Sequence, residues 1–247
     1  AAVARVTVQD GAVTGVVLAS GDAVPAPLVC SSADPRRTFL ELLDPDLLDP
    51  EFARAVTHIK FRGAAARLIL SLAEPPPFTT LCVAPSLDDV ERAADAAKYG
   101  RVSERPWLEA RAAGVDAAGR HRVGVHVQYA PYELQDGEWD AARRDALGDV
   151  AVGLLAEHVP GFGATVLARE VLTPRDLEAR YGAAEGNLDH GELTLDQILF
   201  MRPVPGWAHY RTPVRGLYLC GAGAHPGGGI AGGAGLLAAR AVVRDRR

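Results

Sequence analysis

The chain has 247 residues, of which 48% are hydrophobic and 23% are charged, so it can bury a sizeable core and is neither disordered nor fibrous. Its net charge of -5 gives no basic surface for nucleic acid, which we therefore do not expect as a partner. Cys30, Cys82 and Cys220 form no Cys-x-x-Cys pair, a pattern that favours a reduced, cytoplasmic protein without a disulfide framework or zinc site. No apolar run is long enough for a transmembrane segment.

The beginning of the chain predicts an antiparallel three-stranded meander. Residues 3–8, 12–18 and 23–30 are rich in β-forming residues, and glycine-containing turns separate them. Asp34 and Pro35 then suit the cap and the first position of a helix. The chain opens on strand-like residues at Ala1, and Met201 is its only methionine, so we expect a fragment of a longer protein.

The middle of the chain predicts a strand-rich layer with helices to one side, which we interpret as a second domain. Strands are expected at residues 64–72, 78–83, 107–111, 122–129 and 165–172, where β-branched and apolar residues gather between turn signals. Helices are expected at residues 35–43, 86–99, 139–158 and 173–181, and also after Asp49-Pro50.

The C-terminal stretch predicts a buried strand, a glycine-rich turn and a helix. The uncharged apolar run after Gly216 is typical of a strand buried on both faces. In the helix that follows, a solvated stripe of arginines is expected opposite an apolar remainder that includes Leu236 and Val243. The stripe consists of Arg240, Arg244 and Arg247.

Glycines in such a turn let a ligand approach the backbone, and the N-terminus of the next helix attracts anionic or electron-rich groups. The spacing Gly221-x-Gly223-x-x-x-Gly227 differs from the Gly-x-Gly-x-x-Gly of a primary dinucleotide site. From spacing alone, a turn that serves only packing is an equally good interpretation. Hydrolytic motifs are absent from the sequence, whereas flavin chemistry requires few catalytic side chains.

Several motifs in the second half of the chain resemble the phytoene desaturase-like flavoprotein oxidoreductases. Residues 216–229, with 202–205 and 210–213, resemble the flavin-contacting C-terminal segment of that family. Residues 172–177 and 186–197 are similar to its branch of pyridine nucleotide-disulfide oxidoreductase domain-containing proteins. The family's N-terminal ADP-binding strand, glycine turn and acid have no counterpart in this sequence.

The resemblance implies a mixed α+β and α/β fold, the C-terminal portion of a two-domain FAD-dependent oxidoreductase. Residues 1–35 would supply the β-meander and exit strand of the FAD domain. Residues 36–200 would form the substrate-binding domain, a β-sheet with helices on one side. Residues 201–247 would return to the FAD domain as strand, glycine-rich turn and helix.

The resemblance also implies a set of FAD-contacting residues. The first three would pass beside the pyrophosphate or ribityl chain, the others would line the flavin ring, and His225 is a weak catalytic candidate that could equally hold the loop. The set is Gly221, Ala222, Gly223, His225, Pro226, Gly227, Gly228, Gly229 and Ile230. The resemblance also places four polar residues near the join of the two domains, where they could equally hold the join together or touch substrate: Asn187, His190, Gln197 and Arg202.

The function implied is that of a desaturase, dehydrogenase or isomerase acting on an apolar, isoprenoid substrate. We expect the chain to be inactive alone, because the ADP-binding unit is missing. Its expected partners are that missing N-terminal half and, through exposed apolar surface, other copies of itself. Two alternatives remain: a non-catalytic binding or assembly module that keeps the fold, and an amine oxidase-like flavoenzyme.

Overall fold

The computed structural model describes residues 1–63, 65–228 and 232–246 and divides the chain into two compact units. Unit 1 combines residues 1–61 with residues 188–247, and unit 2 comprises residues 62–187. The boundaries after residues 35 and 200 were predicted from the functions of the segments. Those boundaries stay a prediction, because a division into compact units does not show which function each segment has.

Unit 1 begins with the predicted meander. Strands β1 (Val3–Gln9), β2 (Ala12–Leu18) and β3 (Ala23–Pro25) form an antiparallel three-stranded sheet. The third strand is shorter than predicted, because the chain leaves the sheet after Pro25. Pro25 and Pro27 have no amide hydrogen to donate to a neighbouring strand, which explains why the predicted strand 23–30 is divided.

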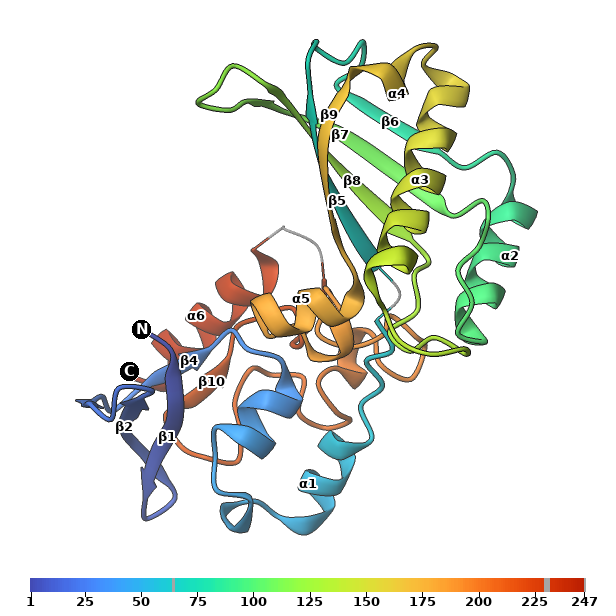
Figure 1. Ribbon diagram of the computed structural model, residues 1–247. Helices are drawn as coiled ribbons and strands as arrows, with labels where there is room; N and C mark the ends of the chain where they lie inside the picture. Colours follow the sequence, from blue (N-terminus) through green and yellow to red (C-terminus); the bar gives the residue numbers. More distant parts are fainter. Residues whose placement is uncertain (64, 229–231, 247) are drawn as a thin grey trace. The chain divides into compact units, whose positions relative to one another are not determined.

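The second piece of that predicted strand, β4 (Val29–Ser31), pairs with β10 (Leu217–Leu219) in a parallel two-stranded sheet. Leu217, Tyr218 and Leu219 are all buried, which confirms the predicted strand with two covered faces. Segments from the two ends of the chain therefore lie side by side in unit 1 (Figure 1). Because the two strands are parallel, the segment after β4 and the glycine-rich turn after β10 leave the sheet at the same edge.

Short helices surround this sheet in unit 1: η1 (Arg37–Glu41), η2 (Pro45–Leu47), α1 (Pro50–Thr57), η4 (Leu199–Met201) and α6 (Gly233–Asp245). Both predicted Asp-Pro starts are confirmed. The carboxylate of Asp34 accepts a hydrogen bond of 3.0 Å from the Arg37 amide, and that of Asp49 accepts one of 2.9 Å from the Glu51 amide. The ring of Phe52 packs edge-on against Phe39 at a centroid distance of 4.9 Å.

The buried face of α6 differs from the prediction. It consists of Ala234, Ala238 and Ala241, whereas Leu236 and Val243 are each 55% exposed. The arginines at 240 and 244 are exposed as expected, and Arg247 lies outside the described residues. Alanines on the inner face let the helix pack closely against its neighbours. In α6 this close packing leaves no room for larger side chains on that face.

Unit 2 is built on one antiparallel sheet of five strands in the order β6-β7-β8-β5-β9. The strands are β5 (Ala65–Leu72), β6 (Thr80–Val83), β7 (Trp107–Val115), β8 (His121–Gln128) and β9 (Val166–Leu172). The helices are α2 (Leu87–Lys98), α3 (Ala141–His158), α4 (Phe162–Thr165), α5 (Pro174–Tyr181) and η3 (Ala184–Gly186). All five predicted strands are present, whereas α4 was not predicted.

The core of unit 2 lies between the sheet and α3, which runs along one face (Figure 1). Alternate residues of β5 and β8, such as Leu68 and Val125, are fully buried there together with Leu155 of α3. The opposite face is polar, since Arg67, His126 and Glu109 are neighbours across three strands. The predicted strand-rich layer with helices on one side, and with it the mixed fold class, is confirmed.

Helix α5, predicted at residues 173–181, begins with a capping box formed by Thr173 and Asp176. The Asp176 carboxylate accepts hydrogen bonds of 2.7 Å from the Thr173 hydroxyl and 2.9 Å from Nη2 of Arg144 on α3. Burial alone would raise the pKa of Asp176, but the bonds from Arg144 and Thr173 outweigh it and lower that pKa. A carboxylate with a lowered pKa stabilises the fold above its unfolded pKa, and loses that effect as the pH falls through the folded pKa.

Asp176→Asn is therefore expected to lower the free energy of unfolding by about 1–2 kcal/mol at pH 7. The loss should shrink below about pH 4, where wild-type Asp176 also becomes protonated. Urea unfolding of wild type and variant, at pH 7 and at a pH below about 4, measures the loss of stability under each condition. Glu170→Gln is the matched control, because its ion pair with Arg180 is exposed and should contribute less than about 1 kcal/mol. An equal loss at the two pH values would show that the charge of Asp176 has no part in its effect.

Candidate functional site

The glycine-rich segment forms a compact turn between β10 and α6 in unit 1. The Ala224 amide donates to the Gly221 carbonyl at 3.0 Å, and the Gly227 amide donates to the Ala224 carbonyl at 2.8 Å. An ideal Cβ on Gly233, the first residue of α6, would lie 3.2 Å from Cγ of Pro226. The predicted order of strand, glycine turn and helix is confirmed, and we call residues 221–228 the glycine turn.

Two glycines of this turn are required by close contact with the segment after β4. A Cβ on Gly221 would overlap the carbonyl oxygen of Ser32, and one on Gly223 would overlap the Pro35 ring. The turn therefore passes directly over residues 32–35, where any side chain would push the two segments apart. This packing accounts for Gly221 and Gly223 with or without a ligand.

The far end of the turn lies against a different segment. Gly227 has φ +99°, a conformation that favours glycine, and its ideal Cβ would be 3.3 Å from Nη1 of Arg202. A Cβ on Gly228 would overlap the Asp189 carboxylate. The glycine turn is thus held between residues 32–35 on one side and residues 189–202 on the other.

Arg202 is buried beside this turn with only 3% of its surface exposed. Its Nη2 donates to the backbone carbonyls of Asp189 at 2.5 Å and Gly191 at 2.9 Å. Its Nε and Nη1 are buried and make no hydrogen bond among the described residues. Buried donors are nearly always satisfied in folded proteins, so these two atoms indicate room for an acceptor that the described residues do not supply.

Two histidines add further unused polar atoms around the turn. The Nδ1 atoms of His190 and His225 are buried and lack a hydrogen-bond partner among the described residues. Burial lowers the pKa of His190, while the charge of Asp34 opposes this effect. His190 is therefore neutral at pH 7, and its ring can either donate or accept one hydrogen bond at Nδ1.

The predicted flavin-contacting residues fall into two groups. Those from Gly221 to Gly228 belong to the glycine turn, where Gly223 is buried, Ala222 and His225 are half-buried and Pro226 is exposed. Gly229 and Ile230 lie outside the described residues. Of the polar residues assigned by resemblance to a domain join, His190, Gln197 and Arg202 belong to unit 1, whereas Asn187 belongs to unit 2.

The resemblance grouped Arg202 with the flavin-contacting segment and His190 with the domain join, but it did not predict that both side chains lie against the glycine turn. Their contacts with it span more than twenty residues of chain, so no local pattern reports them. One weak signal exists for Arg202, which stands inside the apolar run from Ile198 to Val204. A lone charge in such a run is a candidate for burial, and buried charges gather at functional sites.

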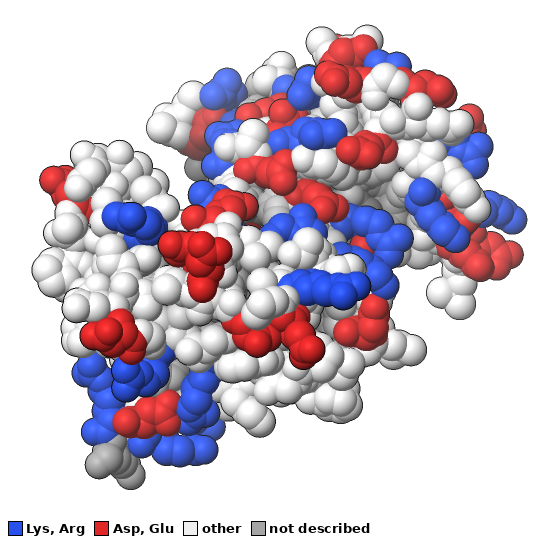
Figure 2. Space-filling model, turned by 90° about the horizontal axis from the view of Figure 1, so that it is seen from below, with Lys and Arg blue, Asp and Glu red and all other residues white. Residues whose placement is uncertain are grey.

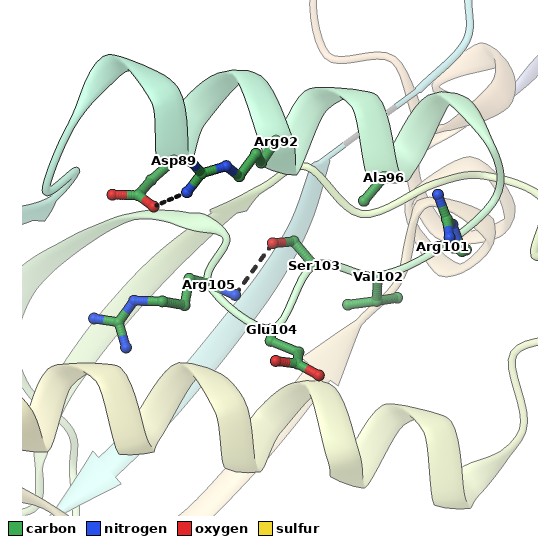
Figure 3. Close-up of a pocket in the computed structure, with 8 residues that line it drawn as sticks. All are labelled: Asp89, Arg92, Ala96, Arg101, Val102, Ser103, Glu104 and Arg105. Carbon is green, nitrogen blue, oxygen red and sulfur yellow. Dashed lines mark hydrogen bonds and ion pairs between the residues drawn. The ribbon is translucent and has the colours of Figure 1, made fainter.

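A cavity of about 390 Å³ lies in unit 2, between α2 and the segment that precedes β7 (Figure 3). Its arginines already have acidic partners or lie in solvent: Arg92 pairs with Asp89 at 3.5 Å, and Arg105 pairs with Glu157 at 2.8 Å. Arg101 and Glu104, which also line the cavity, are exposed to solvent, and none of the buried polar atoms that lack a partner in the described residues belongs to the cavity. The glycine turn is the better candidate site.

Other types of site find no support in the described part of the chain. That part holds no group of three or more metal-ligating side chains, and the three cysteines are free. None of its helices is both long and apolar enough to cross a membrane. On the face shown in Figure 2, acidic side chains lie among the basic ones.

Comparisons with known proteins show similarity along nearly the whole chain. The chain is 37% identical over 98% of its length to rat (Rattus norvegicus) pyridine nucleotide-disulfide oxidoreductase domain-containing protein 2, of which it covers 46%. It is 26% identical to a lycopene-forming phytoene desaturase of a Paracoccus species, over 98% of this chain and 49% of the relative. A limonene dehydrogenase polypeptide from Castellaniella defragrans is 34% identical over 50% of the chain and 22% of its own length.

A solved oxidoreductase from Methanosarcina mazei has a similar fold, with a TM-score of 0.55 and 16% identity over 98% of this chain and 48% of its own. No protein-family model matches the chain. The chain spans about half the length of the curated relatives it matches. These findings confirm the resemblance to phytoene desaturase-like oxidoreductases that the C-terminal motifs indicated.

Proposed function

We propose that this chain, a relative of the pyridine nucleotide-disulfide oxidoreductase domain-containing proteins and the phytoene desaturases, is the C-terminal part of an FAD-dependent oxidoreductase. In this proposal the glycine turn lies against the flavin, and residues outside the chain bind the ADP half of the cofactor. Gly229 and Ile230 remain part of the proposed ring-lining set.

The observation that carries the proposal is the concentration of unused polar atoms around one glycine turn. Arg202, His190 and His225 each bring buried nitrogen atoms without a partner among the described residues. A flavin nucleotide is rich in oxygen and nitrogen acceptors, in its phosphates and along the pyrimidine edge of its ring. The residues present therefore fit this cofactor, whereas a turn that served packing alone would leave no buried donors unsatisfied.

Each part of the site would have a separate task. The flavin, when bound, supplies the two-electron chemistry, while the protein supplies binding, orientation and electrostatics. The glycine turn brings main chain close to the cofactor without intervening side chains. The N-terminus of α6, which begins at Gly233 next to Pro226, contributes amide groups and a positive dipole end favourable to negative charge.

We propose an apolar, isoprenoid substrate, because the relatives are named for the hydrocarbons limonene and phytoene. The open face of the sheet in unit 2 carries Arg67, Glu109 and His126, so this face alone does not provide an apolar lining. A hydrocarbon site would need apolar residues from elsewhere in the complete protein. The missing N-terminal half is also a candidate cover for Leu236 and Val243, the exposed apolar residues of α6.

The proposal predicts that flavin content depends on the N-terminal half. The visible absorbance of the purified full-length protein should show about one FAD per chain, while residues 1–247 alone should carry little, because the ADP-binding unit is missing. Adding a separately produced N-terminal half should restore absorbance and activity. A full-length protein without affinity for flavin would contradict the proposal, and tight FAD binding by residues 1–247 alone would contradict the need for a second half.

A further inference from the structure

Arg202 is a buried cation without an acidic partner. It is 3% exposed, and no ion pair joins its guanidinium to a carboxylate among the described residues. Only Nη2 is used, in its bonds to the carbonyls of Asp189 and Gly191. A guanidinium stays protonated in proteins, so the full charge remains in this buried position.

This arrangement is costly in the structure as described. A buried charge without a counter-charge is strongly destabilising, and two buried N–H groups without acceptors add to the cost. Burial lowers the pKa of Arg202, and the charge of Asp189 opposes this effect only in part. A bound anion would remove the penalty by supplying both the charge and the acceptors.

One of the two unused guanidinium nitrogens, Nη1, lies next to the glycine turn. Nη1 of Arg202 is the atom nearest to the position that a Cβ would take on Gly227, at 3.3 Å, and Cδ follows at 3.6 Å. Gly227 therefore leaves open the space in front of Nη1 that any side chain would fill. His225 lies two residues away with its own unused Nδ1 atom. A ligand that lies against the turn at Gly227 would therefore meet Nη1 of Arg202.

We infer that Arg202 binds an anionic or electron-rich oxygen group of the ligand that the glycine turn receives, through its Nη1 atom. A donor that carries the guanidinium charge suits an oxygen atom of an anionic group such as a phosphate. The inference rests on the proposed function, which supplies FAD as the ligand. In FAD the group is either a phosphate or the carbonyl-bearing edge of the flavin ring.

Titration of the flavin-free full-length protein with FAD, FMN and riboflavin tests the inference. Arg202→Gln removes the charge and should weaken FAD binding about 10- to 100-fold, the usual effect of losing hydrogen bonds from a charged group. Arg202→Lys keeps the charge and should recover part of the affinity. Loss for FAD and FMN alone assigns the contact to a phosphate, and equal loss for all three flavins assigns it to the ring. Either pattern supports Arg202 as a ligand-binding residue.

Gln197→Leu is the matched control. Gln197 is also buried, and its amide bridges backbone atoms of Lys60 and Glu192, so its loss disturbs the same region without removing a charge. This variant should lose stability but keep its FAD affinity within about twofold, as expected for a site outside the binding contacts.

Unchanged affinity for all three flavins in a folded Arg202→Gln protein would overturn the inference and leave the proposed function intact. Failure of the wild-type protein to bind any flavin would instead contradict the proposed function. Titration with inorganic pyrophosphate in parallel tests for an anion site at Arg202 independently of the flavin ring. Pyrophosphate binding that disappears in Arg202→Gln would still support an anion site at Arg202, and a wild-type protein that binds neither pyrophosphate nor any flavin would overturn both the inference and the proposed function.

Discussion

Gly221→Ala is expected to lower the free energy of unfolding of unit 1 by about 2–4 kcal/mol, because overpacking against rigid backbone is among the costly substitutions. The added methyl group would overlap the carbonyl oxygen of Ser32. That carbonyl belongs to the main chain, so no side-chain rotation can relieve the overlap. The segment after β4 and the glycine turn would have to separate, and flavin affinity in the full-length protein should fall as well.

Urea unfolding measures the stability change, with Gly153→Ala as the matched control. Gly153 lies inside α3, and an ideal Cβ there meets no atom within 4 Å. The same substitution at this position should stabilise the protein by about 0.5–1 kcal/mol, through the higher helix propensity of alanine. If Gly221→Ala were as harmless as Gly153→Ala, the close passage of the turn over residues 32–35 would be wrong.

Leu155→Ala is expected to lower the free energy of unfolding of unit 2 by about 2–5 kcal/mol, the range for removing a large buried aliphatic side chain. Leu155 is fully buried between α3 and the five-stranded sheet, where no solvent can fill the space left behind. The loss should appear in the unfolding transition of unit 2. Far-ultraviolet circular dichroism during urea unfolding follows it.

Leu87→Ala provides the comparison for this variant. Leu87 is 88% exposed at the first position of α2, so its truncation should change stability by no more than about 0.5 kcal/mol. Similar effects of the two substitutions would contradict the assignment of the core to the space between the sheet and α3. We expect the larger loss of stability for Leu155→Ala, because Leu155 is buried and Leu87 is exposed.

Local signals predicted most of the secondary structure. The Asp-Pro pairs at 34–35 and 49–50, the glycine-containing turn between the first two strands and the strand predicted at residues 122–129 each depend on a few neighbouring residues, and the structure confirms them. The division of the strand at residues 23–30 was not predicted, although Pro25 and Pro27 were visible. Their effect depends on which strand each segment joins, and that pairing is a long-range property.

The burial of particular side chains was harder to predict. Hydrophobicity suggested Leu236 and Val243 for the inner face of α6, but the helix packs through alanines. A hydrophobic pattern reports which residues tolerate burial, whereas the available space decides which of them are buried. The same limit applies to the site. The glycine turn was predicted from its own residues, but the approach of Arg202 and His190 depends on contacts distant in sequence.

The central claim is that the glycine turn lies against a flavin and that its neighbours satisfy the cofactor's polar atoms. A crystal structure of the flavin-loaded full-length protein tests this claim most directly. We predict that residues 221–228 lie in van der Waals contact with the cofactor and that Nη1 of Arg202 donates to one of its oxygen atoms. A flavin bound elsewhere, with the turn covered by protein side chains and Arg202 paired to a carboxylate, would contradict the account.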